Sequence, residues 1–290
     1  MPRVDPVKSV VLTYCTLTPL DPIQRNGWNP PSSMSNPPSC KIQLLEDIDQ
    51  FRQCLEIQHL AWGFSDADIL PIRSLLICSK IGGQVFGAID DSGQVLGFLN
   101  AFPGYRNGKV YLHSNMLGVR PDYQNHGIGR QLKLAQREEA LSRGIELVEW
   151  TFDPLEVRNA RINLELLGAI CRTYLVNFYG LSSSHLHGGL PTDRLVAEWH
   201  LNSARVKSRL GSTPSPPAHS DGMASLEIPL SIQHLKSAEP EAAARIQSGV
   251  RERMMELFER SFFASRLTID APNHKATYLF ESFEQSNPVT

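Results

Sequence analysis

The pattern of hydrophobic and polar positions divides residues 41–202 into alternating strands and helices. Short apolar runs predict strands at 41–45, 84–89, 95–102, 110–119, 145–152, 170–178 and 195–201. Apolar residues at helical spacing predict helices at 46–61, 127–143 and 156–167, whereas 72–79 fits either type. This order predicts an α/β or α+β fold, in which helices flank a mixed sheet.

The C-terminal part of the chain has a different pattern. Residues 226–232 alternate like a strand, residues 239–260 carry one apolar helical face, and residues 262–269 are aromatic and β-branched. A strand-helix-strand unit of this size is too small to be stable alone. We therefore expect it to pack on the preceding domain, with a homodimer as the alternative.

Proline-rich and serine-rich stretches mark the boundaries between these parts. Residues 1–39 predict a disordered lead-in, and Met34, close to its end, is a second candidate start. The stretch 211–217 is typical of a linker, which we place at 203–224. The predicted domain then spans 40–202 and the C-terminal extension 225–290.

Composition narrows the classes of partner. The chain has 290 residues, 28 Lys and Arg against 30 Asp and Glu, and a net charge of -2, which gives no case for binding nucleic acid or an anionic membrane. Its 5 cysteines form no C-x-x-C pair, as expected for reduced thiols in the cytoplasm. We predict neither a signal peptide nor a membrane anchor.

The most informative motif lies between the predicted strand 110–119 and the helix 127–143. It reads Gln124-Asn125-His126-Gly127-Ile128-Gly129, followed by Arg130. The first N–H groups of a helix have no partner within it and carry partial positive charge, so they bind anions. Glycines let the main chain approach a phosphate closely. We therefore expect a pyrophosphate at this turn.

Two common nucleotide-binding motifs fit the paired glycines less well. A dinucleotide fingerprint requires G-x-G-x-x-G and a ribose-binding acid, and both are missing here. A P-loop requires a Lys-Ser/Thr pair, which is also missing. A plain tight turn remains the alternative.

The motif and its surroundings resemble the GNAT superfamily of acyl-CoA N-acyltransferases. The family signature [Q/R]-x-x-G-x-[G/A] is complete at Gln124–Gly129, and Asn159-Ala160 opens a helix that ends Leu166-Leu167-Gly168, similar to a second family region. Within that family, residues 150–155 and 191–195 are similar to a bacterial branch of predicted acetyltransferases. The resemblance covers roughly residues 41–202 and implies a mixed, mostly antiparallel sheet flanked by helices.

The resemblance implies a binding mode for acetyl-CoA. The backbone of the turn would hold the pyrophosphate, through Gln124, Asn125, His126, Gly127, Ile128, Gly129 and Arg130. The strand ending Leu117-Gly118-Val119 would separate from strand 145–152, and the pantetheine arm would bind its main chain in the gap. Asn159 would face the arm. The acceptor would be an amine of a small molecule or a peptide, and no metal is implied.

The catalytic residues are less well defined. Many relatives carry a Tyr that protonates the departing thiolate, and its position is Leu164 here. Tyr174 or Tyr179, beside the following strand, are alternatives for the acid, against core packing. For the base we consider His113, Glu149 and Asp153. Each has a structural alternative, which is a strand hydrogen bond for His113, an exposed edge position for Glu149 and an Asx turn for Asp153. We expect a raised pKa for Glu149 among apolar neighbours.

Further polar residues allow two interpretations each. Arg194 binds an acidic group of the acceptor or pairs with Asp193. His185, His187 and His200 suggest a metal site, but a polar loop is the favoured interpretation because no further ligand stands nearby at suitable spacing.

These observations predict a cytoplasmic, acetyl-CoA-dependent N-acetyltransferase in which an amine attacks the thioester directly. The alternative is a CoA-binding sensor or scaffold without activity, which the replacement of the usual Tyr by Leu164 keeps open. Transfer to oxygen and use of a longer acyl chain also remain open.

Overall fold

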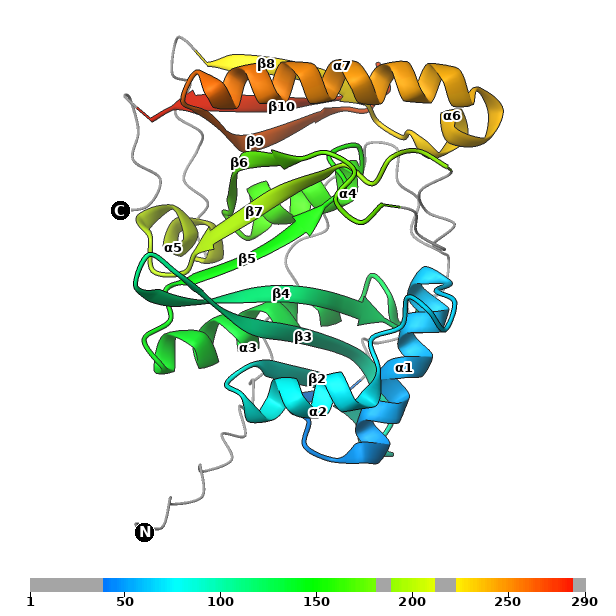
Figure 1. Ribbon diagram of the computed structural model, residues 1–290, viewed down its shortest axis with the longest axis vertical. Helices are drawn as coiled ribbons and strands as arrows, with labels where there is room; N and C mark the ends of the chain where they lie inside the picture. The colour runs from blue at the N-terminus through cyan, green and yellow to red at the C-terminus, as the bar shows by residue number, and fades with distance from the viewer. Residues whose placement is uncertain (1–38, 181–188, 212–222, 284–290) are drawn as a thin grey trace.

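The computed structural model describes residues 39–180, 189–211 and 223–283. The lead-in up to residue 38 with Met34, the linker segment 212–222, and His185 and His187 lie outside the described residues. The described strands form a 10-stranded sheet in the order β1-β2-β3-β4-β5-β7-β6-β9-β10-β8 (Figure 1). Its strand pairs are antiparallel except β4 with β5, which confirms the predicted mixed, mostly antiparallel sheet.

The strands of the sheet are β1 (Cys40–Leu44), β2 (Gln84–Asp90), β3 (Val95–Arg106), β4 (Lys109–Val119), β5 (Leu147–Phe152), β6 (Ile170–Leu175), β7 (Arg194–His200), β8 (Ala224–Pro229), β9 (Phe262–Asp270) and β10 (Lys275–Ser282). The helices are α1 (Ile48–Trp62), α2 (Ile72–Lys80), α3 (Ile128–Ser142), α4 (Val157–Arg161), α5 (Ala204–Leu210), α6 (Gln233–Ala238) and α7 (Pro240–Glu259). A 3-10 turn, η1 (Pro121–Tyr123), and a π turn, η2 (Ile162–Leu166), complete the described elements.

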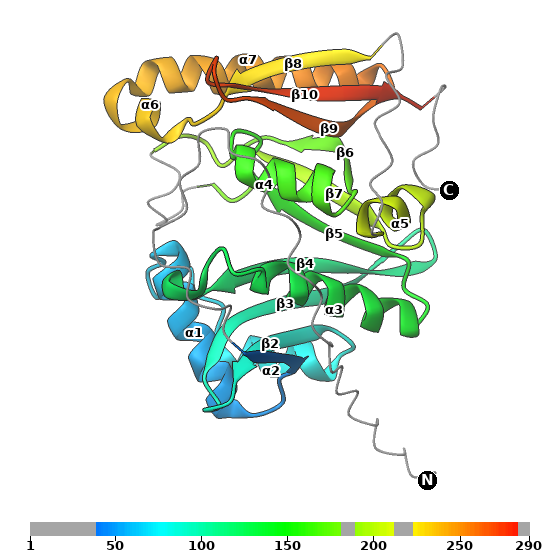
Figure 2. The ribbon, with the colours of Figure 1, turned by 180° about the vertical axis from the view of Figure 1, so that it is seen from behind.

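Helices cover the two faces of the sheet unevenly. Figure 1 shows α1 and α2 in front of the β2–β4 part and α7 in front of the C-terminal strands. Seen from behind, α3 and α4 cover the other face (Figure 2). Among the described helices, none lies in front of the central part of β5 in Figure 1.

Several elements differ from the sequence-based expectations. Residues 72–79, which fitted either type, form α2 because Leu75 and Cys78 are buried one helical turn apart. The predicted helix 156–167 is α4 followed by η2, in which the N–H of Leu167 donates to Ile162 O. The predicted strand 170–178 ends at Leu175, two residues before the left-handed Asn177.

The predicted linker 203–224 was wrong at its start, which contains α5. Ser203 caps this helix by accepting from the Val206 N–H, and Val206 is its buried residue. The extension also contains more than a strand, a helix and a strand, because α6 precedes α7 and β10 follows β9. Ala276, Tyr278 and Phe280 of β10 are buried at alternate positions, a pattern that the sequence does contain.

The C-terminal strands continue the sheet of the preceding domain. β9 pairs with β6 at Cys171↔Ala264, and both residues are buried. Met254 of α7 and Tyr278 of β10 belong to the same hydrophobic cluster as Leu195 of β7. The extension and the domain therefore share one core.

Candidate functional site

The parallel strands β4 and β5 separate soon after they pair. Their register contains two residue pairs, Leu112↔Val148 and His113↔Glu149, although β4 continues to Val119 and β5 to Phe152. Figure 1 shows the two ribbons diverging from this point. We call residues 114–119 of β4 and 150–152 of β5 the β4–β5 divergence.

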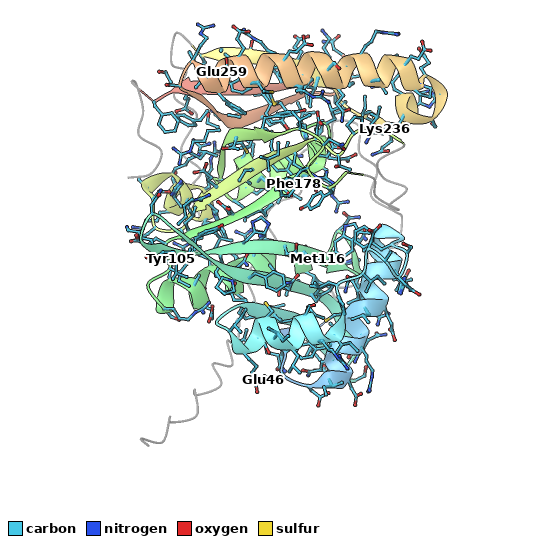
Figure 3. The ribbon with its side chains drawn as sticks, in the orientation of Figure 1. Glu46, Tyr105, Met116, Phe178, Lys236 and Glu259 are labelled. Atoms are coloured by element: carbon cyan, nitrogen blue, oxygen red, sulfur yellow. The ribbon has the colours of Figure 1, made fainter. Side chains whose placement is uncertain are left out.

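A bulge marks the start of the divergence on β4. Ala101 pairs with Ser114 and Asn100 with Met116, so Asn115 has no opposite residue on β3. Figure 3 shows Met116 on the β4 side of the divergence and Phe178, beyond the end of β6, on the other side. A bulge of this kind redirects the main chain beside a site.

Beyond the bulge, alternate residues of β4 direct their main-chain N–H and C=O groups toward β3 and away from it. The Arg120 N–H donates to Leu96 O of β3, at 2.8 Å. Because bonding directions alternate along an antiparallel strand, Leu117 and Val119 direct their N–H and C=O groups away from β3, into the divergence. The side-chain amide of Gln124 already donates to Val119 O, at 3.1 Å.

The glycine turn follows directly and starts α3. Gly127 is its N-cap, with φ 82, and no side chain caps the helix. Asn125 is also left-handed, with φ 67, which suits an Asn. A Cβ on Gly129 would lie 3.3 Å from Leu117 Cδ2, so the turn sits against β4. The uncapped start of α3 therefore lies beside the main chain of the divergence.

The first turn of α4 lies next to the glycine turn. Arg158 donates from a guanidinium nitrogen to Asn125 Oδ1, at 2.7 Å, and both Arg158 and Asn159 are exposed. Arg158 was not predicted from the sequence, although its place beside Asn159 was a usable signal. The structure thus adds a cation to the predicted anion site.

The candidate base His113 forms a group with Glu149 and Arg106 where β4 and β5 still pair. His113 Nδ1 lies 3.7 Å from Glu149 Oε1, and Arg106 donates to Glu149 Oε2, at 2.6 Å. Burial alone would raise the pKa of Glu149, but His113 and Arg106 outweigh it and the pKa lies below its ordinary value. The expectation of a raised pKa was wrong, because Arg106 supplies the missing charge.

A second carboxylate group lies beside the first. Glu198 of β7 pairs with Glu149 in the register and is likewise buried. Arg172 binds it through two nitrogens, at 2.8 and 2.9 Å, and His200 Nε2 lies 3.4 Å from it. Burial would raise the pKa of Glu198, but these partners hold it below its ordinary value. His200 therefore belongs to an ion-pair group.

The structure places Asp153 in a turn after β5. Its Oδ1 accepts the Leu155 N–H, at 2.9 Å, as in the Asx turn considered from sequence. Its Oδ2 lies 3.4 Å from Lys236 Nζ of α6. Both carboxylate oxygens thus have partners, and Asp153 lies apart from the His113 group.

Tyr174 is engaged in a buried network with the extension. Its hydroxyl donates to Asp193 Oδ2, at 2.7 Å, and Arg251 of α7 binds both oxygens of Asp193, at 2.9 and 3.2 Å. Burial, and then this hydrogen bond, raise the pKa of Tyr174 well above its ordinary value. Asp193 thus pairs with Arg251, and Tyr174 keeps its proton in the hydrogen bond that it donates to Asp193.

Tyr179 lies closer to the divergence than Tyr174. Its hydroxyl is 2.8 Å from Thr151 Oγ1 of β5, two residues along from Glu149 and on the same face. Arg194 stacks over its ring, with 5.2 Å from Cζ to the centroid. Leu164, at the position of the usual family Tyr, is fully buried.

The described residues provide neither a clustered metal site nor a spanning helix. Among them, groups of three or more His, Cys, Asp or Glu that could hold a metal ion do not occur. Within the same part of the chain, every helix is too short or too polar to cross a membrane.

Comparison with known proteins gives a family for the N-terminal half. Residues 51–162 match the acetyltransferase (GNAT) family, which confirms the resemblance inferred from the glycine turn. No curated protein sequence matches the chain significantly.

Solved structures of similar fold include three acetyltransferases. The ribosomal-protein-S18-alanine N-acetyltransferase of Escherichia coli is 18% identical and matches 56% of this chain and 94% of its own, with a TM-score of 0.44. An aminoglycoside 6'-acetyltransferase type Ii is 19% identical, with 55% and 96% covered and a TM-score of 0.44. A GNAT family N-acetyltransferase from Escherichia coli in complex with CoA is 18% identical, with 59% and 88% covered and a TM-score of 0.39.

Proposed function

Because the chain contains a domain of the GNAT acetyltransferase family at residues 51–162, we propose that it is an acetyl-CoA-dependent N-acetyltransferase. The observation that carries this proposal is the uncapped start of α3 beside the β4–β5 divergence, with His113 and Glu149 at the closed end of the divergence. The acceptor class that we propose is an amine of a small molecule or a peptide.

The turn supplies the groups that a CoA pyrophosphate needs. The backbone N–H groups from Asn125 to Arg130 lie at the start of α3, where the helix dipole favours an anion. The Gln124 N–H donates to Pro121 O, at 3.2 Å, so Gln124 contributes through its side chain on Val119 O. Arg158 adds a charged donor next to Asn125. The main-chain groups of Leu117 and Val119 would pair with the pantetheine amides as a strand would.

His113 is the base that we propose. Its Nδ1 faces Glu149, so Nε2 is left to take the proton of the acceptor amine. The carboxylate fixes the orientation of the ring and stabilises the imidazolium that forms. Glu149 itself stays ionised between His113 and Arg106, so we assign it the positioning role.

The reaction then needs no covalent enzyme intermediate. The deprotonated amine nitrogen attacks the thioester carbonyl carbon, the C–N bond forms, and the C–S bond breaks with its electron pair leaving on sulfur. A main-chain N–H at the Asn115 bulge would polarise the thioester carbonyl. His113 takes the proton of the amine.

Thiol release from acetyl-CoA in the presence of a panel of amines tests this function. We expect turnover of at least one amine, and a loss of roughly 100-fold or more in kcat for His113→Gln. His234→Gln, an exposed histidine on α6, is the matched control and should keep wild-type activity.

Calorimetry with CoA separates the proposal from its alternative. If CoA binds, no amine is turned over and His113→Gln changes nothing, the chain is a CoA-binding sensor or scaffold, the alternative that rests on Leu164. If CoA does not bind at all, both are wrong.

A further inference from the structure

Lys133 is a buried lysine on the second turn of α3. Its Nζ donates to Ser114 Oγ of β4, at 2.9 Å, and to Gln136 Oε1, at 3.0 Å. The Nζ also lies 3.7 Å from the centroid of the Trp150 ring of β5. Within the described part of the chain, burial is the only influence found on the charge of Lys133, and no charged group contributes. These three partners are all neutral.

A chain of hydrogen bonds through two amides links Lys133 to the acidic residue Glu139. Gln136 donates to Gln84 Oε1, at 3.0 Å, and Gln84 donates in turn to Glu139. This series of hydrogen bonds gives the side-chain amides of Gln136 and Gln84 their partners but brings no negative charge to Lys133. Burial consequently lowers the pKa of Lys133 well below its ordinary value.

Stability does not explain a lysine at this position. Removing a charge from water costs several kcal/mol, and a buried ion without a counter-charge is replaced by an apolar side chain with a gain in stability. Ala140, two turns further along the same side of α3, is also fully buried, so an apolar side chain is accommodated on this side of the helix.

The position of the ammonium relative to the sheet points to its use. Ser114 and Trp150 are the first residues beyond the last β4–β5 pair, His113↔Glu149. Successive residues of a strand point to opposite faces. The Nζ of Lys133 therefore lies at the closed end of the divergence on the α3 face, and the His113 group lies there on the opposite face.

We propose that Lys133 stabilises the thiolate of CoA as it leaves the acyl group. This inference rests on the proposed function, which places the thioester at the closed end of the divergence. As the amine nitrogen bonds to the carbonyl carbon and the C–S bond breaks, sulfur takes the electron pair. The thiolate is the counter-charge that the ammonium lacks, and the amine proton stays on His113. CoA leaves as the thiolate and is protonated by water.

The experiment is a titration of the thiol of bound CoA, followed by the ultraviolet absorbance of the thiolate. An opposite charge within a few ångströms lowers a pKa by roughly 1–3 units. In the wild-type complex we expect the thiol pKa to lie below that of free CoA. Lys133→Met should bring it back to the free value or above, with CoA still bound in calorimetry.

Lys80→Met, an exposed lysine at the end of α2, is the control and should keep the wild-type thiol pKa. Lys133→Met should also unfold at the same temperature as the wild type or higher, whereas a lysine with a purely structural role would lower the unfolding temperature.

The outcomes distinguish this inference from the proposed function. A wild-type complex whose thiol pKa equals or exceeds that of free CoA overturns the role of Lys133, whether or not any variant folds. An unchanged thiol pKa in folded Lys133→Met overturns it too. In both cases CoA binding and amine turnover by the wild type leave the proposed function standing.

Discussion

Glu149 and Glu198 lie directly opposite each other on β5 and β7, and both are buried. Like charges at opposite positions of a sheet normally destabilise it. Here Arg106 neutralises the first and Arg172 the second, and the pKa values of both carboxyl groups lie below their ordinary values. The first of these groups contacts the candidate base His113, and the second lies beside the first on β7.

The depressed pKa of Glu149 predicts how stability depends on pH. Its ionisation contributes stability that is fully present above the unfolded-state pKa of about 4.3 and is lost as the pH falls through the lower folded-state pKa. In Glu149→Gln this contribution is missing at every pH. Urea unfolding from about pH 7 down to about pH 3 should therefore show a shallower loss of stability than in the wild type.

Glu259→Gln, an exposed carboxylate at the end of α7, serves as the control. It should reproduce the wild-type pH dependence. Parallel curves for Glu149→Gln and the wild type would contradict the ion-pair assignment.

At the scale of single residues, sequence identified Glu149 but not its surroundings. The apolar neighbours Val148 and Trp150 are visible in the sequence, and they suggested a raised pKa. Arg106, which reverses the shift, is 43 residues away at the end of β3. Only the β3–β4 pairing brings it close, and no local pattern encodes that distance.

Among the elements, α3 joins the anion site to β4. Gly129 stands in its first turn with ordinary helical backbone, so alanine is allowed there, unlike at the left-handed Gly127. A Cβ would meet Leu117 Cδ2 at 3.3 Å, a flexible side-chain end that can give way. At the pyrophosphate site that we propose, the added methyl group would keep the phosphate away from the backbone.

We therefore expect Gly129→Ala to fold and to bind CoA at least roughly tenfold more weakly, a loss of about 1.4 kcal/mol. Calorimetry with CoA measures the effect. Gly249→Ala is the matched control, since Gly249 lies within α7 with open space at its Cβ. That variant should keep wild-type affinity and gain roughly 0.5–1 kcal/mol in stability. Equal affinity of Gly129→Ala and the wild type would contradict the site.

Long periodic elements were predictable and short ones were not. Ile128, Leu132 and Ala135 recur at helical spacing and are buried as expected, so α3 was found within a residue of its ends. Residues of α5 and α6 form too few turns to show a period. The π turn η2 changes the spacing within a helical pattern, and its cause lies in packing rather than in local sequence.

For the whole molecule, the extension holds the segments that border the candidate site. Gln247 of α7 donates to Pro191 O, at 2.9 Å, and Arg251 binds Asp193. Asp193 in turn accepts the Asn177 N–H, and Thr192 Oγ1 accepts the Tyr179 N–H. This network fixes the main chain that carries the Tyr179 ring to Thr151.

Arg251→Ala tests the network. It leaves the fully buried Asp193 carboxylate without its cation, which we expect to cost about 3 kcal/mol in unfolding free energy. Arg245→Ala breaks an exposed pair with Glu241 on the same helix and should cost less than about 1 kcal/mol. Denaturant unfolding measures both variants. Equal losses of unfolding free energy would contradict a stabilising role for the buried pair of Arg251 with Asp193.

Such long-range pairs set the limit of sequence-based prediction for this molecule. The apolar face of α7 showed that the extension needs a partner surface. The pairing of Asp193 with Arg251, 58 residues apart, depends on the sheet order that places β9 beside β6. From the sequence, the only partner predicted for Asp193 was therefore its neighbour Arg194.

The divergence of β4 from β5 has a consequence for hydrogen exchange. The amides of Leu117 and Val119 point into it and have no partner strand there, so they should exchange quickly in the free protein. The Arg120 amide, bonded to Leu96 O, should exchange slowly and serves as the internal reference. With CoA bound, protection of Leu117 and Val119 should approach that of Arg120, as measured by amide exchange in nuclear magnetic resonance. The ligand would then complete the sheet between β4 and β5.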